Sequence, residues 1–188
     1  MKKSYIIIIV IVAVIAIIAF SFIGSYNGLV KLEENVDGMY ADVEVQLERR
    51  ADLIPNLVNT VKGYVKHEES TIEKVTTARE NLLKAQGIED KARANEELSS
   101  ALNGLMILVE NYPDLKANTN FINLQDELAG TENRISTARR DYNNAVKSYN
   151  AKIKTIPTNI VAAMSGFDEK EYFKADDSKK EVPSIDFN

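Results

Sequence analysis

The sequence has no cysteine and only one histidine, His67. Without cysteine the chain forms no disulfide, carries no lipid on a cysteine and lacks the thiolates of structural zinc sites. With one histidine it has neither the H-E-x-x-H motif of zinc peptidases nor the repeated Glu-x-x-His motifs of di-iron bundles. We therefore expect no metal site and no cofactor. We interpret His67 as a helix-surface residue, with pH sensing as the alternative role.

The sequence also lacks the short motifs of common active sites. It contains no Gly-x-Gly-x-x-Gly, no Walker loop and no Gly-x-Ser-x-Gly. Carboxylate pairs such as Glu96 and Glu97 arise on helices by chance and do not indicate acid–base catalysis without a cleft. We expect no catalytic residues and interpret the chain as a non-enzyme. The alternative is an envelope enzyme, or a subunit of one, without a recognisable motif.

Basic residues are fewer than acidic ones, 23 against 28, which gives a net charge of −5. Without Lys2 and Lys3 the balance is 21 against 28. Because Lys and Arg neutralise phosphates in nucleic-acid complexes, so acidic a domain is not expected to bind nucleic acid. The same charge repels anionic headgroups, so we expect the domain to stand off the membrane.

The one long hydrophobic run lies at the amino end, from Tyr5 to Ile23, interrupted only by Ser21. Its 19 residues reach about 29 Å as a helix, close to the ~30 Å hydrocarbon thickness of a bilayer. We predict a single transmembrane anchor, residues 1–24, that contacts the membrane through residues 5–23. A cleaved signal peptide is the alternative, but its apolar run is usually shorter and ends at a small-residue cleavage site that is missing here.

Lysines near the span predict its orientation. Lys2 and Lys3 precede it, whereas Lys31 is the one basic residue in the fifteen residues that follow it. This bias places the amino end in the cytoplasm and the domain outside. Gly24 and Gly28 have the spacing of a helix-dimerisation motif, so a homo-oligomer is an open alternative to a simple hinge there.

Helical periodicity dominates the rest of the chain. Steps of three and four residues connect a nearly apolar stripe, in which Thr131 and Lys152 are the exceptions: Phe121, Leu124, Leu128, Thr131, Ile135, Ala138, Tyr142, Ala145, Tyr149, Lys152 and Ile156. Five heptads of this kind are typical of a helix packed along others with a shallow twist. No segment alternates with period two, so we expect no strands.

Three further helices are predicted before this one. The first covers residues 26–53. The second begins at Pro55, which fits a first turn but would lose a bond and clash with the Ala51 carbonyl inside a helix. A kinked continuous helix is the alternative. Gly87 is expected as the left-handed cap of the second helix, and the third covers residues 89–111.

Short connections make neighbouring helices antiparallel. The predicted fold is all-α, an antiparallel up-and-down four-helix bundle at residues 25–157, after the single transmembrane helix. A tail, residues 158–188, follows. Six of its apolar residues are expected to pack on the bundle, with a partner-docking peptide as the alternative: Phe167, Tyr172, Phe173, Val182, Ile185 and Phe187.

Several runs along nearly the whole chain carry a family resemblance. They are residues 46–57 (QLERRADLIPNL), 61–64 with His67 and Glu68, 112–118 (YPDLKAN), 124–128 (LQDEL), 131–135 (TENRI), 138–143 (ARRDYN), 166–167, 172–173 and 183–187 (PSIDF). In these runs the chain resembles the LemA family. The resemblance implies a four-helix bundle on one membrane anchor and implies no catalytic residues. Ile156 departs from the family, which favours phenylalanine before this proline.

Two polar groups that flank the predicted helix ends form our candidate partner-binding set: Arg49, Arg50, Asp52, Asn56, Asp114, Lys116 and Asn118. The bundle topology gathers them near the end far from the membrane. A local interpretation is the alternative, in which Asp52 caps the second helix and the arginines bind carbonyls at the end of the first. The recognition hypothesis makes them a surface for a protein partner, so that the chain acts as a binding or scaffolding module at the cell envelope.

Overall fold

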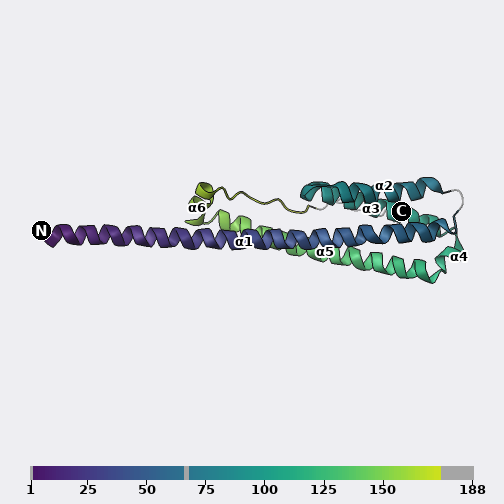
Figure 1. Cartoon of the computed structure of the whole chain (residues 1–188), viewed down its shortest axis with the longest axis horizontal. Helices are drawn as coiled ribbons and strands as arrows, with labels where there is room; N and C mark the ends of the chain where they lie inside the picture. Colours follow the sequence, from purple (N-terminus) through teal and green to yellow (C-terminus); the bar gives the residue numbers. More distant parts are fainter. Residues whose placement is uncertain (1, 66–67, 175–188) are drawn as a thin grey trace, which may run out of the picture. The chain divides into compact units, whose positions relative to one another are not determined.

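The computed structural model describes residues 2–65 and 68–174, which form helices joined by short connections. The helices are α1 (Lys2–Lys62), α2 (Glu69–Lys84), α3 (Gly87–Val109), α4 (Pro113–Lys116), α5 (Thr119–Ile153) and α6 (Thr158–Ser165) (Figure 1). These residues contain no strand, so the predicted all-α class is confirmed. His67 and the tail residues Val182, Ile185 and Phe187 lie outside the described residues.

The chain divides into two compact units. Unit 1 comprises Met1–Met39 with Asp141–Glu171, and unit 2 comprises Tyr40–Arg140 with Tyr172–Asn188. Because α1 and α5 each cross a unit boundary in the sequence, both helices contribute residues to both units.

Contacts within unit 2 define the direction of each helix. Lys91 pairs with Glu44 at 2.6 Å and Asn95 accepts a bond from Arg50, so α3 ascends beside α1 in the same direction. On α5, Glu132 meets Arg50 while Asn118, just before the helix, meets Tyr64, so α5 runs the opposite way. Residues 85–86 join α2 to α3 as a tight hairpin. These directions are those of an up-and-down bundle.

The predicted stripe on the last long helix faces the interior of both units. In unit 2, Phe121, Leu128 and Ile135 are at most 6% exposed, as are Tyr142 and Tyr149 in unit 1. The stripe fails at its end, where Lys152 and Ile156 are exposed. The helix itself stops at Ile153, three residues before the predicted end.

The helix start predicted at Pro55 is wrong, because α1 continues through this proline to Lys62. A proline inside a helix leaves the carbonyl four residues earlier without its N–H donor. Here that carbonyl belongs to Ala51, and Arg79 of α2 donates its Nε–H to it at 2.8 Å. A side chain from the neighbouring helix therefore replaces the missing backbone bond.

Gly87 adopts the predicted left-handed conformation, with φ +75°. Its predicted role as the cap of the preceding helix is wrong, since Ala85 occupies that position and donates its N–H to the Asn81 carbonyl. Gly87 is instead the first residue of α3, where glycine turns the chain sharply between the two helices.

The amino-terminal part of α1, in unit 1, is apolar and uncovered. Side chains from Tyr5 to Phe20 are exposed except at half-buried Ala16, and the most apolar window has a mean hydropathy of 3.5 with none of it buried. A helix of this length and composition can cross a membrane. Burial on α1 begins at Leu29, which is fully buried in unit 1.

The segment after α6 lies along α5 in unit 1. Asn150 donates to the Lys170 carbonyl at 2.8 Å and accepts from the Lys170 N–H at 2.9 Å, so one buried amide holds the backbone twice. Tyr142 donates its hydroxyl to the Glu171 carbonyl at 2.8 Å. Phe167 packs edge-on against Tyr26, with ring centroids 5.5 Å apart.

In unit 2, Phe173 is buried and stacks with Tyr40, whose ring centroid lies 6.4 Å away, whereas Tyr172 is 40% exposed.

Candidate functional site

The seven candidate residues all lie in unit 2, but they differ in burial. Arg50 is 5% exposed and Asn118 is half-buried. The other five are exposed: Arg49, Asp52 and Asn56 on α1, and Asp114 and Lys116 on α4. The set therefore separates into residues that hold the bundle together and residues that face solvent.

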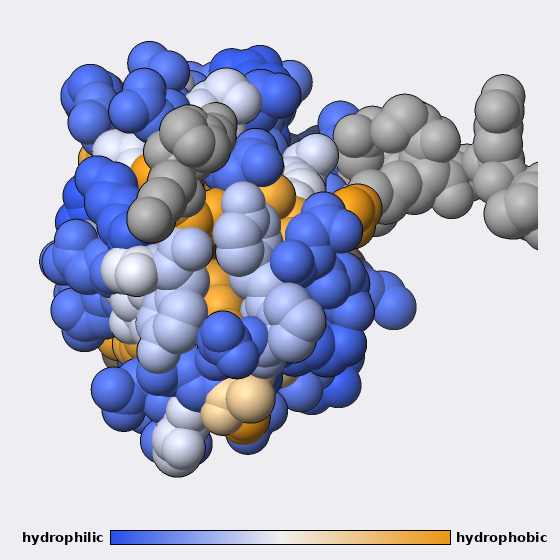
Figure 2. Space-filling view, turned by 90° about the vertical axis from the view of Figure 1, so that its right-hand side faces the viewer, coloured by the Kyte–Doolittle hydropathy of each residue, from blue (hydrophilic) through white to orange (hydrophobic). Residues whose placement is uncertain are grey.

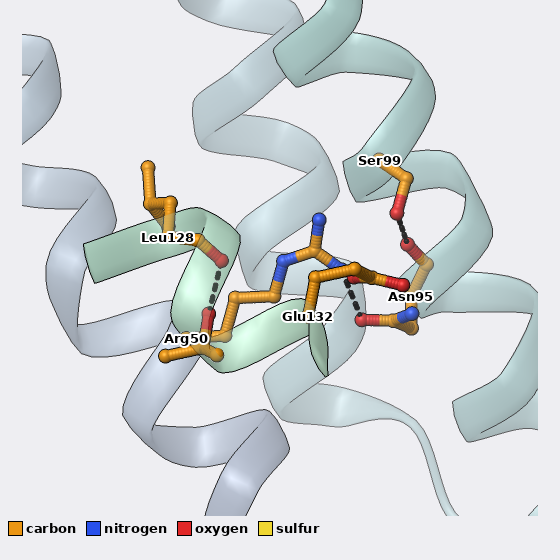
Figure 3. A network of polar contacts seen from close by, with 6 residues as sticks. Arg50, Asn95, Ser99, Leu128 and Glu132 are labelled. Carbon is orange, nitrogen blue, oxygen red and sulfur yellow. Dashed lines mark hydrogen bonds and ion pairs between the residues drawn. The ribbon is translucent and has the colours of Figure 1, made fainter. Parts of the chain in front are cut away.

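Arg50 is the centre of a buried polar network (Figure 3). Its Nη1 donates to the Asn95 side-chain oxygen at 2.7 Å and forms an ion pair with Glu132, so one guanidinium joins α1, α3 and α5. Asn95 is 1% exposed, and Ser99 donates its hydroxyl to the Asn95 backbone carbonyl. Three helices thus meet around one buried cation.

A second arginine, Arg139 of α5, belongs to the same charged group. Its guanidinium lies 5.2 Å from the centre of the Phe173 ring. Burial lowers the pKa of both arginines, while the carboxylates of Glu132 and Glu96 act in the opposite direction. Arg50 is buried, whereas Arg139 and Glu96 are half-buried. The Glu132 side chain is 47% exposed, so two carboxylates at the edge of the core compensate the two cations.

This network fixes how α1 is rotated about its own axis. A buried guanidinium without its partners costs several kcal/mol, so rotations that expose or unpair Arg50 are disfavoured. Arg79 adds a second restraint at Ala51, the next residue along α1. The face of α1 opposite these bonds is held toward solvent.

Three of the candidate residues form one exposed row, which we name the α1 strip: Arg49, Asp52 and Asn56. Their spacings of three and four place them on the same helix face. The strip combines a cation, an anion and an amide, which together donate and accept hydrogen bonds. The local interpretation of Asp52 as a helix cap is wrong, because Asp52 lies inside α1, ten residues before its end.

Asn118 has a structural role at the loop before α5. Its Oδ1 accepts a bond from the Phe121 N–H at 3.1 Å, which is the bond of an N-cap residue. Its Nδ2 donates to the Tyr64 hydroxyl at 2.8 Å, so the loop lies beside the end of α1. Lys116 pairs with Glu110, and both side chains are more than half exposed.

The surface of unit 2 around α4 is mostly polar. Figure 2 looks onto this surface and shows hydrophilic residues over most of the face, with apolar residues visible between them near the middle. Such a surface suits contact with water or with a polar protein surface rather than insertion into lipid.

Sequence reasoning missed Asn95, Glu132 and Arg139 as members of the buried network. Their spacing could have found them, because Asn95 lies three residues before buried Leu98. Glu132 and Arg139 likewise lie three residues before and four residues after buried Ile135. They were missed because the prediction followed apolar side chains only. Within the described part of the chain, no three or more His, Asp or Glu side chains gather where they could hold a metal ion.

Comparison with known proteins identifies the family. The model of the LemA family matches residues 39–187. The chain belongs to the LemA family. This LemA chain is thus a membrane-associated protein with one apolar amino-terminal helix.

Named relatives match most of this LemA chain. Magnetosome protein MamQ 2 of Paramagnetospirillum magneticum is 30% identical over 175 residues, covering 79% of this chain and 64% of that protein. Protein LemA of Metamycoplasma hominis is 26% identical over 165 residues, covering 85% of this chain and 74% of that protein. Magnetosome protein MamQ of Magnetospirillum gryphiswaldense is 27% identical over 174 residues, covering 79% of this chain and 64% of that protein. The chain therefore spans just under two thirds of the length of the MamQ proteins.

Proposed function

We propose that this chain is a membrane-anchored scaffold of the cell envelope that binds a partner protein through the α1 strip. The observation that carries the proposal is the division of two neighbouring arginines. Arg50 points into the bundle, where its Nη1 binds Asn95 and Glu132, whereas Arg49 faces solvent on the same helix face as Asp52 and Asn56. The buried residue fixes the helix, and the exposed ones are presented in a fixed row.

A protein is the partner that this row suits best. Mixed charges and an amide on a rigid helix complement a polar protein surface, and such preorganised groups lose little entropy on binding. The acidic net charge of −5 disfavours nucleic acid. Asp114 and Lys116 extend the surface at the loop that Asn118 ties to the end of α1.

The lysines before the span support an orientation with the amino end in the cytoplasm and the helical domain outside. The partner is then a protein of the envelope.

A photo-crosslinking amino acid placed at Asp52 of the full-length chain tests the proposal in intact membranes. We expect one discrete crosslinked product of defined mass, because the strip holds one partner in one position. The matched control is the same amino acid at Glu73, an exposed acidic residue on α2 away from the strip. Equal and heterogeneous products from both positions would show random collision and refute the strip as a binding surface.

A further inference from the structure

The short helix α6 in unit 1 is apolar on two sides. Thr158, Val161 and Ala162 are at most 3% exposed and cover one side. On the other side Ile160 is 56% exposed and Met164 is 74% exposed. A single exposed apolar residue is ordinary, but apolar residues on successive turns of a surface helix form a stripe that requires a partner.

The stripe extends beyond α6 at its amino end. Ile156, in the turn two residues before α6 begins, is 83% exposed, and Ala163, beside Met164 on α6, is exposed as well. From Thr155 to Phe167 the chain has no charged side chain, and Lys154 and Asp168 are the nearest charges. An uncharged segment with exposed isoleucine and methionine is poorly suited to water.

The position of α6 along α1 identifies what covers the stripe. Phe167, two residues after α6, packs against Tyr26 with ring centroids 5.5 Å apart. Tyr26 lies three residues beyond Ile23, the last residue of the apolar run, which is a rise of about 4.5 Å along the helix. Figure 1 shows α6 beside α1 at this level. Both belong to unit 1, so α6 lies where α1 leaves the apolar segment.

A bilayer centred on the apolar run therefore has its headgroup boundary at α6. Interfacial helices lie in this zone with the apolar face buried by about 5–10 Å. Ile23 at the end of the run is itself 54% exposed, so the exposed apolar surface of α1 reaches to within three residues of Tyr26, against which Phe167 packs.

We propose that α6 is an interfacial membrane helix whose exposed residues Ile160 and Met164, together with Ile156 in the turn before it, insert into the leaflet from which α1 emerges. The inference rests on the membrane anchoring in the proposed function. It adds a second lipid contact beside the span, so that the anchor is held by two elements and the orientation of unit 1 at the membrane surface is restricted.

The test uses the full-length chain in liposomes, since the absence of cysteine allows single labels. The variants Ile160→Cys and Met164→Cys carry an environment-sensitive fluorophore, and the lipids carry a nitroxide quencher just below the headgroups. Ile107→Cys on α3, where the isoleucine is 73% exposed in unit 2, is the matched control away from the membrane. Ile15→Cys, at the centre of the apolar run, reports insertion of the span itself in a parallel sample whose lipids carry the nitroxide near the ends of the acyl chains. The variant Ala163→Cys repeats the measurement with a smaller change in side-chain volume.

We expect labels at 160, 163 and 164 to be quenched several-fold more strongly than the label at 107. If they are quenched no more than the label at 107 while the label at 15 is quenched, the inference fails and the anchor stands. If the label at 15 is not quenched either, the anchoring fails and the inference falls with it. If the fluorophores at 160, 163 and 164 are shielded from water more strongly as the protein density in the liposomes rises, and not as lipid is added, the stripe packs against a second copy of the chain. That result would overturn the proposal.

Discussion

At the scale of single residues, two adjacent arginines have opposite environments on the same helix. Arg50 is 5% exposed and bound by Asn95 and Glu132, while Arg49 is exposed. Adjacent positions on a helix point about 100° apart, so burying one of them turns the other toward the edge of the interface. Two identical side chains therefore differ in environment, one joining helices in the interior and the other facing solvent, where the proposed partner would meet it.

Replacing Arg50 with glutamine should destabilise the fold. Glutamine removes the cation that joins three helices and leaves the buried oxygens of Asn95 and Glu132 without their charged donor, a loss of about 2–3 kcal/mol. Thermal unfolding followed by circular dichroism should show a melting temperature lower by about 5–10 °C. Arg49→Gln is the matched control and should change it by at most about 2 °C. Equal effects of the two substitutions would contradict the assigned roles.

Arg79 and Pro55 should be energetically coupled through the Ala51 carbonyl. Arg79→Met removes the donor from this carbonyl and should cost about 1–2 kcal/mol. In a Pro55→Ala background, residue 55 regains a backbone N–H that can bond to the Ala51 carbonyl. In that background Arg79→Met should therefore lower the free energy of unfolding by less. A double-mutant cycle by denaturant unfolding should give a coupling of about 0.5 kcal/mol or more. Strictly additive effects would mean that the Arg79 bond does not compensate for the proline.

Contacts between side chains on different helices could not be predicted from the sequence. The heptad stripe from Phe121 to Tyr149 was readable, because a helix repeats its faces locally. The meeting of Arg50 with Asn95 and Glu132 depends on the register between helices that are distant in sequence. Rotating or shifting one helix by a single residue would separate these side chains without changing any local pattern.

At the scale of elements, the most consequential difference concerns α1. Local rules favoured a helix break at Pro55, and they were overridden by one tertiary hydrogen bond from Arg79. As a result the apolar run, the unit 1 core residue Leu29 and the unit 2 core residue Val43 all belong to one helix, Lys2–Lys62. The helix that can span a membrane thus continues without a linker into the residues that pack both cores.

The segment after α6 should loosen at high pH. Lys170 forms a hydrogen-bonded ion pair with Glu33 at 2.8 Å, and this bond raises the pKa of Lys170 above its ordinary 10.5. Burial raises the pKa of the neighbouring Tyr149 above 10.0. For both groups the folded state holds its proton more tightly, so their stabilisation is complete below the ordinary pKa values and is lost as the pH rises through the raised ones.

Melting curves between pH 8 and pH 11.5 measure this dependence. We expect the melting temperature to fall from about pH 10 upward, and we expect Lys170→Met to be less stable at pH 8 with a shallower fall. Lys154→Met is the control, because Lys154 pairs with Glu169 at an exposed position. An unchanged pH profile in Lys170→Met would show that this lysine contributes nothing to the alkaline transition.

At the scale of the whole molecule, the LemA family and the apolar amino-terminal helix are the two features that the sequence and the structure have in common. The LemA family model covers residues 39–187, and α1 has one apolar stretch able to span a membrane. Both were readable from the sequence, because hydrophobic length and long family-specific runs need no knowledge of tertiary contacts. The exposed apolar residues of α6 could not be recognised from the sequence, because they stand out only once the burial of the other face of this helix is known.

Orientation in the membrane can be measured with one cysteine. Ser70 is exposed on α2, and Ser70→Cys provides one thiol in a chain that has none. We expect a membrane-impermeant thiol reagent to label it on intact cells whose outer envelope admits the reagent. Ser4→Cys, before the span, should be labelled only after lysis. The reverse pattern would place the helical domain in the cytoplasm and redirect the search for its partner.

Partner binding by the α1 strip can be measured by crosslinking from Asp52 in chains with and without Arg49→Gln. We expect wild-type membranes to yield one defined product, and we expect Arg49→Gln to reduce this product several-fold at an unchanged melting temperature. An undiminished product would mean that the partner does not read the strip. A product lost together with the melting temperature would mean that Arg49 is structural, and either result would contradict the proposed function.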